Sequence, residues 1–366
     1  MANRYIISGG GTGGHVFPAI AIAHEIKLQN PQAAILFVGA LGRMEMEKVP
    51  AAGYSIEGLW ISGIQRRLTI DNLSFPFKVI SSLWKARKIL KQFKPDVAIG
   101  VGGYASGPLL WMAASMGIPT LIQEQNSFAG LTNKWLSKKV NAICVAFEGM
   151  EKFFPAYKIK ITGNPVRREM LVDLPDKVTA REAFGLSPEK PTLLVVGGSL
   201  GARTINQSIE AALPQLQDAG VQIIWQTGKA FFEQAKHSSQ ANDQVRVFEF
   251  IHQMAQAYAA ADVVVARAGA LSIAELCCVK KACILVPSPH VTDNHQMHNA
   301  MALANIQAAL VVPDAEAKQV LSAKILALLG DEVMRNELAA NIQLLAKPDA
   351  TATIVGEIFR LGKNSA

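Results

Sequence analysis

Short apolar runs alternate with longer amphipathic stretches along the whole chain of 366 residues. Runs rich in Val, Ile and Leu predict strands that are buried on both faces, as in a parallel sheet. The stretches between them have helical spacing, for example in residues 18–28, 76–93 and 108–116. Strands and helices in alternation predict a doubly wound α/β fold. The predicted strands cover residues 4–8, 33–39, 54–60, 96–103, 119–123, 141–147, 191–198, 221–226, 244–250, 261–266, 282–287 and 308–312.

Each half of the chain opens with a buried strand, a glycine-rich turn and a helix. The two stretches read YIISGGGTGGHVFPAIAIAHEI and LLVVGGSLGARTINQSIEAAL. They predict two Rossmann-like doubly wound domains, which we expect to face each other across a cleft, with a glycine loop on each wall. The sequence GNP at residues 163–165 interrupts the pattern, so we predict domains at residues 1–163 and 164–349. A last helical segment within residues 350–366 is compatible with either domain.

The first glycine loop, GGGTGGH, places backbone N–H groups at a predicted helix N-terminus, with little side chain to keep a ligand away. Such a site favours an anionic or strongly polar group. His15 follows at the start of the helix, where the dipole disfavours its protonated form, so it is a candidate general base. The alternative is a histidine that only bonds a neighbouring carbonyl.

The same loop satisfies the dinucleotide-binding spacing through Gly9, Gly11 and Gly14. That fingerprint expects an acidic residue after the second strand, and the first one present is Glu45, beyond the next turn. Dinucleotide binding is therefore disfavoured. The second loop, GGSLGAR, lacks the lysine of a P-loop, but its amides and Ser199 suit a diphosphate; a tight turn without a ligand is the alternative.

Composition narrows the choice of partner only slightly. The chain has 36 Lys and Arg against 29 Asp and Glu, a net charge of +7, which favours an anionic partner. The aromatic content of 7% and the lack of a recognisable nucleic-acid module argue against nucleic acid. The four cysteines lack metal-ligand spacing, and His290, His295 and His298 have only Asp293 as a nearby acidic partner, so we expect no metal and no cofactor. Residues 97–123 are uncharged, but glycines and prolines divide them, which argues against a membrane span.

Eight motifs then occur in a fixed order: GGGTGGHVFPAIAIA, GVGGYASGP, EQNSFAGLTNKWL, GNPVR, VVGGSLGAR, EFIHQMAQAY, ARAGALSIAELC and DNHQMHNA. Together they closely resemble the MurG family of bacterial UDP-GlcNAc transferases, glycosyltransferase family 28, over residues 6–300. The resemblance implies a GT-B fold with lipid I bound by the first domain and UDP-GlcNAc mainly by the second. It implies metal-independent, inverting transfer of GlcNAc to the C4 hydroxyl of MurNAc in lipid I, giving lipid II.

The resemblance also implies the role of each site residue. His15 corresponds to the proposed base, and Asn126 to a sugar contact. Ile251 corresponds to a position that reads uracil through its backbone, and Glu275 to a ligand of the ribose hydroxyls. Gln296 corresponds to a glutamine that recognises GlcNAc, although His295 stands where one form of the motif has a second glutamine. The implied UDP-GlcNAc-binding residues are Thr12, Gly13, Gly14, Asn126, Arg167, Ser199, Ile251, Ala270, Leu271, Ser272, Ile273, Ala274, Glu275 and Gln296.

A lipid-linked acceptor requires access to a bilayer, and the segment NLSFPFKVISSLWKARKILKQFKP is the candidate surface. Its apolar residues Val79, Ile80, Leu83, Ala86 and Leu90 share one helical face, which we expect to pack on the sheet. Aromatic and basic residues elsewhere on the helix suit anionic headgroups, and the alternative is an ordinary crossover helix with a solvated basic face. The predicted patch contains Phe75, Phe77, Lys78, Trp84, Lys85 and Lys88, with Trp111 and Met112 as an extension.

The expected protein is thus a peripheral enzyme on the cytoplasmic side of the inner membrane. Its implied partners are UDP-GlcNAc, lipid I, the cytoplasmic face of the plasma membrane, and proteins of cell-wall synthesis and division; no nucleic acid is expected. Two rivals share the fold: another UDP-sugar transferase with a glycolipid acceptor, and a UDP-GlcNAc epimerase, which needs no acceptor. A nucleotide- or nucleic-acid-binding regulator is the rival from another class.

Overall fold

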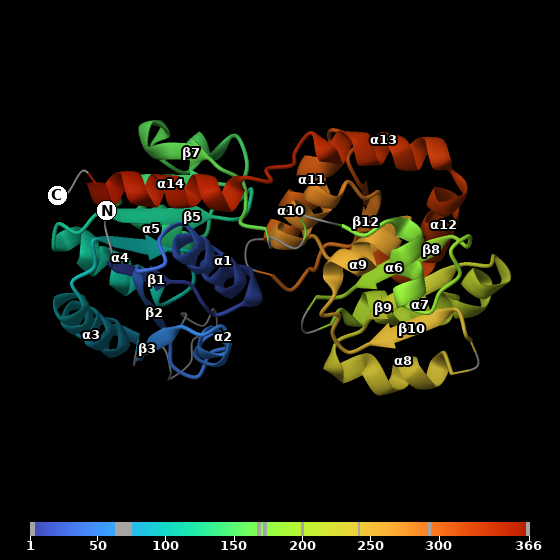
Figure 1. Cartoon of the computed structure of the whole chain (residues 1–366), viewed down its shortest axis with the longest axis horizontal. Coiled ribbons are helices and arrows are strands. Elements are labelled where there is room, and N and C mark those ends of the chain that lie inside the picture. Colours follow the sequence, from blue (N-terminus) through green and yellow to red (C-terminus); the bar gives the residue numbers. More distant parts are fainter. Residues whose placement is uncertain are drawn as a thin grey trace. The chain divides into compact units, whose positions relative to one another are not determined.

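The structure, a computed structural model, describes residues 4–62, 75–166, 170, 174–198, 201–240, 242–291 and 294–363 (Figure 1). The chain divides into two compact units, one of residues 1–166 with 349–366 and one of residues 167–348. Within the described residues, each unit is built around one sheet of parallel strands. The predicted class of two doubly wound α/β domains is therefore confirmed.

Among the described residues, the first unit contains a sheet of seven strands in which β1 lies beside the central strand β4. The strand order is β3-β2-β1-β4-β5-β6-β7. The chain reverses direction across the sheet between β1 and β4, which is the switch point where such sheets bind ligands. The strands are β1 (Arg4–Ser8), β2 (Ala34–Ala40), β3 (Ser55–Leu59), β4 (Val97–Gly100), β5 (Thr120–Glu124), β6 (Ala142–Val145) and β7 (Ile159–Ile161).

Helices cover both faces of this sheet, because alternate residues of its buried strands point to opposite sides. Tyr5 and Ile7 pack with α1 (Gly13–Gln29), α2 (Glu45–Ala51) and α14 (Ala350–Lys363). Ile6 packs with α3 (Phe75–Phe93), α4 (Ser106–Ser115) and α5 (Leu131–Leu136) on the other face. Two short 3₁₀ turns, η2 (Met150–Lys152) and η3 (Ala156–Lys158), precede β7.

The last helix, α14, returns to the first unit, where it lies along α1 (Figure 1). It buries Ile354, Val355 and Ile358 in the same core as Tyr5, and the rings of Tyr5 and Phe359 lie 5.8 Å apart between centroids. This apolar stripe at helical spacing requires a partner, and the sequence left open which domain provides it. The structure assigns it to the first unit.

The second unit repeats the arrangement with the strand order β10-β9-β8-β11-β12-β13 and a switch point between β8 and β11. The strands are β8 (Thr192–Val196), β9 (Gln222–Gln226), β10 (Val245–Phe248), β11 (Val263–Ala266), β12 (Cys283–Leu285) and β13 (Leu310–Val311). The helices and 3₁₀ turns are α6 (Lys177–Ala183), α7 (Arg203–Asp218), η5 (Lys229–Phe231), α8 (Phe232–Ser238), α9 (Met254–Ala260), α10 (Ala270–Val279), α11 (His295–Ala304), η7 (Asp314–Glu316), α12 (Ala317–Gly330) and α13 (Glu332–Gln343).

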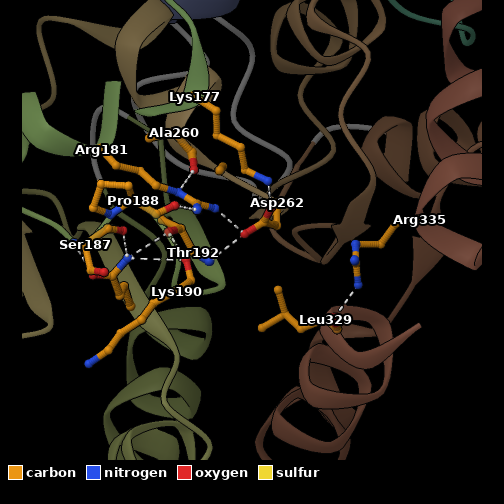
Figure 2. Close-up of polar contacts among 12 residues, drawn as sticks. Lys177, Arg181, Ser187, Pro188, Lys190, Thr192, Ala260, Asp262, Leu329 and Arg335 are labelled. Atoms are coloured by element: carbon orange, nitrogen blue, oxygen red, sulfur yellow. Dashed lines mark hydrogen bonds and ion pairs between the residues drawn. The ribbon is translucent and has the colours of Figure 1, made fainter. Parts of the chain in front are cut away.

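An ion-pair network closes the amino-terminal edge of the second sheet (Figure 2). Arg181 of α6 is buried and donates to the carboxylate of Asp262 at 2.6 Å and to the carbonyl of Ala260 at 3.1 Å. Asp262 also accepts the backbone N–H of Thr192 at 2.7 Å and pairs with Lys177. Because the network lies before β8 and β11, at the opposite edge from their carboxyl ends, we interpret it as structural.

Two elements differ from the sequence prediction. Helix α1 starts at Gly13, five residues before the predicted start, and Pro18 lies inside it. The helical periodicity did not reveal this first turn, because its glycines contribute no apolar side chains to the pattern. The short edge strand β7 was not predicted, since its three residues alternate only Ile, Lys and Ile.

The uncharged segment of residues 97–123 forms β4, α4 and β5, as predicted. Across the described ranges, the helices are all too short or too polar to cross a membrane.

Three of the four cysteines are buried, and burial raises the pKa of the Cys144 and Cys277 thiols to about 12. These two side chains are therefore protonated near neutral pH and pack as small apolar groups, as the sequence suggested.

Candidate active site

The first glycine loop connects β1 to α1 at the switch point of the first sheet. Gly11 has φ of +86°, in the left-handed region that glycine adopts without strain. Thr12 is the N-cap, and its carbonyl accepts the N–H groups of His15 and Val16 at 3.1 Å each. Its side chain makes no capping bond to the helix, so it does not occupy the N–H groups at the helix start.

The imidazole of His15 is held by the same loop. Its Nδ1 lies 3.1 Å from the carbonyl oxygen of Gly10 and 3.3 Å from Oγ1 of Thr12. A carbonyl oxygen can only accept, so we assign the proton to Nδ1 and the basic lone pair to Nε2. The sequence suggested either a general base or a histidine that bonds a neighbouring carbonyl. The two roles are compatible, because an Nδ1–H that bonds the Gly10 carbonyl leaves Nε2 as the basic nitrogen.

A second glycine turn, which follows β4, packs against the first. The N–H of Gly10 donates to the carbonyl of Gly102 at 3.3 Å. A Cβ on Gly102 would lie 2.6 Å from Cδ2 and 2.8 Å from Nε2 of His15, and a Cβ on Gly103 would lie 2.3 Å from the carbonyl oxygen of Gly10. The glycines of the motif GVGGYASGP therefore allow the backbone to approach the His15 ring and the Gly10 carbonyl, which a side chain at either position would prevent.

Asn126 lies in the loop after β5, and a buried carboxylate organises that loop. Oε1 of Glu124 accepts the backbone N–H of Asn126 at 3.1 Å and its side-chain amide at 3.3 Å. Oε2 accepts the N–H of Gly130 at 3.0 Å and Nδ2 of Asn133 at 2.9 Å. Glu124 thus positions Asn126, a role that sequence reasoning missed although the motif EQN contains both residues.

The GNP motif is tied to the same loop by buried amides. Nε2 of Gln123 donates to Oδ1 of Asn164 at 3.0 Å, and Nδ2 of Asn164 donates to the carbonyl of Gln125 at 3.0 Å. Nε2 of Gln125 reaches the carbonyl of Val101, at the end of β4, at 2.8 Å. These bonds link the carboxyl ends of β4 and β5 to the end of the first unit.

In the second unit, the glycine loop after β8 is as crowded as the first. Gly201 has φ of +78°, and a Cβ there would lie 2.2 Å from the carbonyl oxygen of Thr227. A Cβ on Gly197 would lie 2.6 Å from the N of Ala202. Ser199, the implied diphosphate contact, and Arg167, the implied nucleotide contact, lie outside the described residues.

Ile251 is nearly fully buried, and Gln226 at the end of β9 holds it. Oε1 of Gln226 accepts the backbone N–H of Ile251 at 2.8 Å, while Nε2 donates to the carbonyl of Gly198 at 3.2 Å. One side chain therefore connects the glycine loop to the EFI motif. Because the N–H of Ile251 donates to Gln226, the carbonyl is the backbone group of this residue that could make the implied contact with uracil.

Helix α10 contains the implied phosphate and ribose positions. Its N-cap is Gly269, which supplies no side-chain cap, so the N–H groups of the first turn keep the partial positive charge of a helix start. Among the implied contacts, Leu271, Ser272, Ala274 and Glu275 are half-buried, whereas Ala270 and Ile273 are buried. Tyr258 of α9 donates to Oε2 of Glu275 at 3.1 Å and thereby orients that carboxylate.

Further contacts hold the loops around α10 and α11. Arg267 donates to the carbonyl of Val286 at 3.0 Å and pairs with Asp314, which also accepts the hydroxyl of Thr204 at 2.9 Å. Oε1 of Gln296 accepts the N–H of Ser288 at 2.8 Å, so its Nε2 is the group suited to a sugar oxygen. Within the described residues, no group of three or more His, Cys, Asp or Glu side chains could hold a metal ion.

The chain matches the models of both domains of one enzyme family. The N-terminal domain of glycosyltransferase family 28 matches residues 5–145, and the C-terminal domain of that family matches residues 192–354. A solved structure, that of Acinetobacter baumannii MurG, aligns with a TM-score of 0.80 at 32% identity, covering 98% of this chain and 99% of that one.

Curated relatives agree with these matches. A protein of Cytophaga hutchinsonii is 58% identical over 358 residues, which are 98% of this chain and 96% of the relative. A protein of Bacteroides fragilis is 53% identical over 368 residues, which are 100% of this chain and 97% of the relative. Both are named UDP-N-acetylglucosamine--N-acetylmuramyl-(pentapeptide) pyrophosphoryl-undecaprenol N-acetylglucosamine transferase.

Two parallel, doubly wound domains, each with a glycine loop at its switch point, define the GT-B class of fold, and the matched domain models are those of a glycosyltransferase. The chain belongs to glycosyltransferase family 28.

Proposed function

We propose that this enzyme transfers GlcNAc from UDP-GlcNAc to the MurNAc residue of lipid I, with inversion at the anomeric carbon, and so produces lipid II. Membership of the family and the names of relatives that align over nearly the whole chain support the substrates. The observation that carries the chemistry is the His15 imidazole, whose Nδ1 is committed to the Gly10 carbonyl and whose Nε2 is the basic nitrogen.

In the proposed reaction, Nε2 of His15 removes the proton from the C4 hydroxyl of MurNAc. The resulting oxygen forms a bond to C1 of GlcNAc from the face opposite UDP, and the bond from C1 to the diphosphate oxygen breaks. The leaving diphosphate takes the electron pair. Amides of the glycine loop after β8 and of the start of α10 are the groups suited to stabilise its charge.

The donor contacts are proposed from the second unit. Its Glu275 is oriented by Tyr258 and suits the ribose hydroxyls, and the Ile251 carbonyl suits the uracil. The Nε2 group of Gln296 suits GlcNAc, because its Oε1 is engaged by Ser288. In the first unit, Thr12, Gly13, Gly14 and Asn126 are proposed sugar contacts.

Transfer of labelled GlcNAc from UDP-GlcNAc to a short-chain lipid I analogue, in the presence of EDTA, tests this function. We expect an acceptor-dependent product with a β-1,4 link, formed at an unchanged rate when divalent cations are removed. Tight donor binding without product would contradict the proposed acceptor. Conversion of UDP-GlcNAc without any acceptor would instead identify an epimerase.

Peripheral association with the cytoplasmic side of the inner membrane is proposed through α3 and α4. On α3, the side chains of Phe77, Ile80 and Trp84 are 70%, 56% and 73% exposed and recur at helical spacing. Trp111 of α4 is 42% exposed, and Nζ of Lys139 lies 4.2 Å from its ring centre. Exposed Arg87, Lys88 and Lys91 continue the helix, so apolar and basic groups share one surface, as anionic lipid favours.

The structure changes some details of the patch. Placing Ile80 on the buried face was wrong, because Ser82, Ala86, Ile89 and Leu90 form that face. Lys78 donates to the hydroxyl of Ser62 at 3.2 Å, and Lys85 to the carbonyl of Gly58 at 2.7 Å, so both help to hold α3 against the β3 region. Phe75 is half-buried, Lys88 is exposed, and Met112 packs against the core.

Replacing both Phe77 and Trp84 by Ala is expected to weaken binding to vesicles that contain anionic lipid by about tenfold or more, since two large apolar side chains no longer enter the interface. Sedimentation with vesicles measures the loss. The control replaces Val333 and Leu344, which are 68% and 78% exposed in the second unit, by Ala. Equal binding of both variants and the wild type would contradict the proposed surface.

Proteins of cell-wall synthesis and division are the further partners that this location implies.

A further inference from the structure

Glu45, the first residue of α2, is a fully buried acid that the proposed mechanism does not use. Its Oε1 accepts the backbone N–H of Ala40 at 2.9 Å, at the end of β2. Its Oε2 accepts the backbone N–H of Gly11 at 2.8 Å, within the first glycine loop. Both oxygens act as acceptors, as those of an ionised carboxylate do. Glu45 therefore joins the end of β2 to the loop that precedes His15.

The N–H of Gly11 and the carbonyl of Gly10 belong to the same peptide group. The N–H donates to Glu45, and the carbonyl accepts Nδ1–H of His15 at 3.1 Å. One planar amide thus lies between the carboxylate and the imidazole and is hydrogen-bonded at both ends. Hydrogen bonds in such a chain polarise one another, so a charge at one end strengthens the acceptor at the other.

Glycines provide the space for this arrangement. A Cβ on Gly10 would lie 2.2 Å from Oε1 of Glu45, and a Cβ on Gly39 would lie 2.5 Å from its Cγ. On the other side of the amide, a Cβ on Gly103 would lie 2.3 Å from the Gly10 carbonyl oxygen. Three glycines from three segments therefore allow the carboxylate, the peptide and the imidazole to approach one another.

We propose that Glu45 is a positioning residue that orients and polarises His15 through the Gly10–Gly11 peptide. The carboxylate strengthens the Gly10 carbonyl as an acceptor, which holds the Nδ1–H tautomer and directs the lone pair to Nε2. When Nε2 takes the acceptor's proton, the same chain stabilises the imidazolium. A carboxylate that orients a catalytic histidine is known to act by direct contact, whereas here a backbone amide relays the effect. The catalytic part of the inference rests on the proposed role of His15 as the base.

Three neighbours of the ring are consistent with this assignment. Besides the Gly10 carbonyl and the Thr12 hydroxyl, the backbone of Gly102 lies against the edge of the ring that carries Nε2. These are uncharged groups from α1, its preceding loop and the turn after β4. The carboxylate of Glu45, on α2, is the charged group at the other end of the hydrogen-bonded chain.

The test uses Glu45→Gln, which keeps the size of the side chain but removes the charge and one of the two acceptors. In the full-length protein labelled with ¹⁵N-histidine, NMR reports the tautomer and proton affinity of His15 without requiring turnover. We expect loss of the single Nδ1–H tautomer and a proton affinity about tenfold lower, as the removal of a charge at this range implies. The His15 signal is assigned by its absence from His15→Ala.

Kinetics with the soluble acceptor analogue provide the catalytic readout. We expect Glu45→Gln to lower kcat about tenfold or more and to move the acidic limb of its pH profile towards lower pH, with the KM for UDP-GlcNAc changed by less than about threefold. Glu45→Asp, which keeps the charge, is expected to recover part of the rate. A variant damaged only in its folding would lose active protein without moving the pH profile.

Glu124→Gln is the matched control, since Glu124 is also buried and also accepts backbone N–H groups, but in the loop of Asn126. We expect this variant to leave the tautomer and proton affinity of His15 as in the wild type. Unchanged His15 signals in folded Glu45→Gln would overturn the relay. Altered signals with a normal kcat would keep the relay and instead reject His15 as the base. If Glu45→Gln does not fold, Glu45→Asp provides the test: its shorter side chain keeps the charge but lengthens the bond to the Gly11 N–H, so we expect His15 signals that are clearly shifted from the wild type, and signals identical to the wild type would overturn a relay through that bond.

Discussion

Replacing His15 by Ala is expected to lower kcat by about a hundredfold or more while leaving the affinity for UDP-GlcNAc nearly unchanged. Nε2 of His15 is the basic nitrogen at the end of the glycine loop, and general base catalysis contributes effects of this size. The donor contacts proposed in the second unit do not include this side chain. The rate of GlcNAc transfer and the Kd for UDP-GlcNAc, measured on the same preparation, test the two expectations together.

The substitution His15→Asn separates the chemical role from the structural one. The asparagine amide can replace Nδ1–H as a donor to the Gly10 carbonyl, but it has no counterpart of Nε2. We expect this variant to match the thermal stability of the wild type and to remain as inactive as His15→Ala. Substantial recovery of turnover in His15→Asn would show that the histidine only supports the loop.

Replacing Gly201 by Ala is expected to weaken the binding of UDP by about tenfold or more. The new Cβ would lie 2.2 Å from the carbonyl oxygen of Thr227, a backbone atom that also accepts Nδ2 of Asn206 at 2.8 Å. The glycine loop after β8 must move to relieve this contact, and its amides are proposed to hold the diphosphate. Calorimetric titration with UDP measures the effect without an acceptor.

Gly220→Ala provides the matched control for that experiment. Gly220 has φ of +69°, close to the +78° of Gly201, but a Cβ there would meet no atom within 4 Å. Both variants should lose about 1 kcal/mol of stability from the left-handed backbone, and only Gly201→Ala should lose affinity. Wild-type affinity in a folded Gly201→Ala protein would reject the assignment of this loop to the nucleotide.

The alternation of apolar runs with helical spacing was sufficient to predict the architecture. Strands such as β1 and β8 are continuous apolar runs, because a parallel sheet with helices on both faces buries both sides of each strand. The glycine loops follow these strands directly, so their place at the carboxyl edge also follows from the sequence. The eight motifs, taken together and in their order along the chain, were sufficient to indicate the family.

Other features depend on contacts between distant segments. The stripe of α14 shows that this helix needs an apolar partner, but only folding selects α1 and β1, more than 300 residues earlier in the chain. On α3, periodicity alone placed Ile80 on the buried face. The docking of the helix instead buries Ser82 and Ala86 and leaves Ile80 with Trp84 on the surface.

In the candidate site, too, some features follow from the sequence and others depend on tertiary contacts. The sequence by itself determined which residue types are present: a bare glycine loop, a histidine at the start of a helix, and a second glycine turn after β4. Only the tertiary structure decided that Glu45 binds the peptide between Gly10 and Gly11, and that Gly102, which has no Cβ to meet the ring, lies beside His15. The physical reason is that hydrophobic period and turn chemistry act locally along the chain. A hydrogen bond or a close contact between segments exists only once the packing of β2, β4 and α2 around β1 has brought them together.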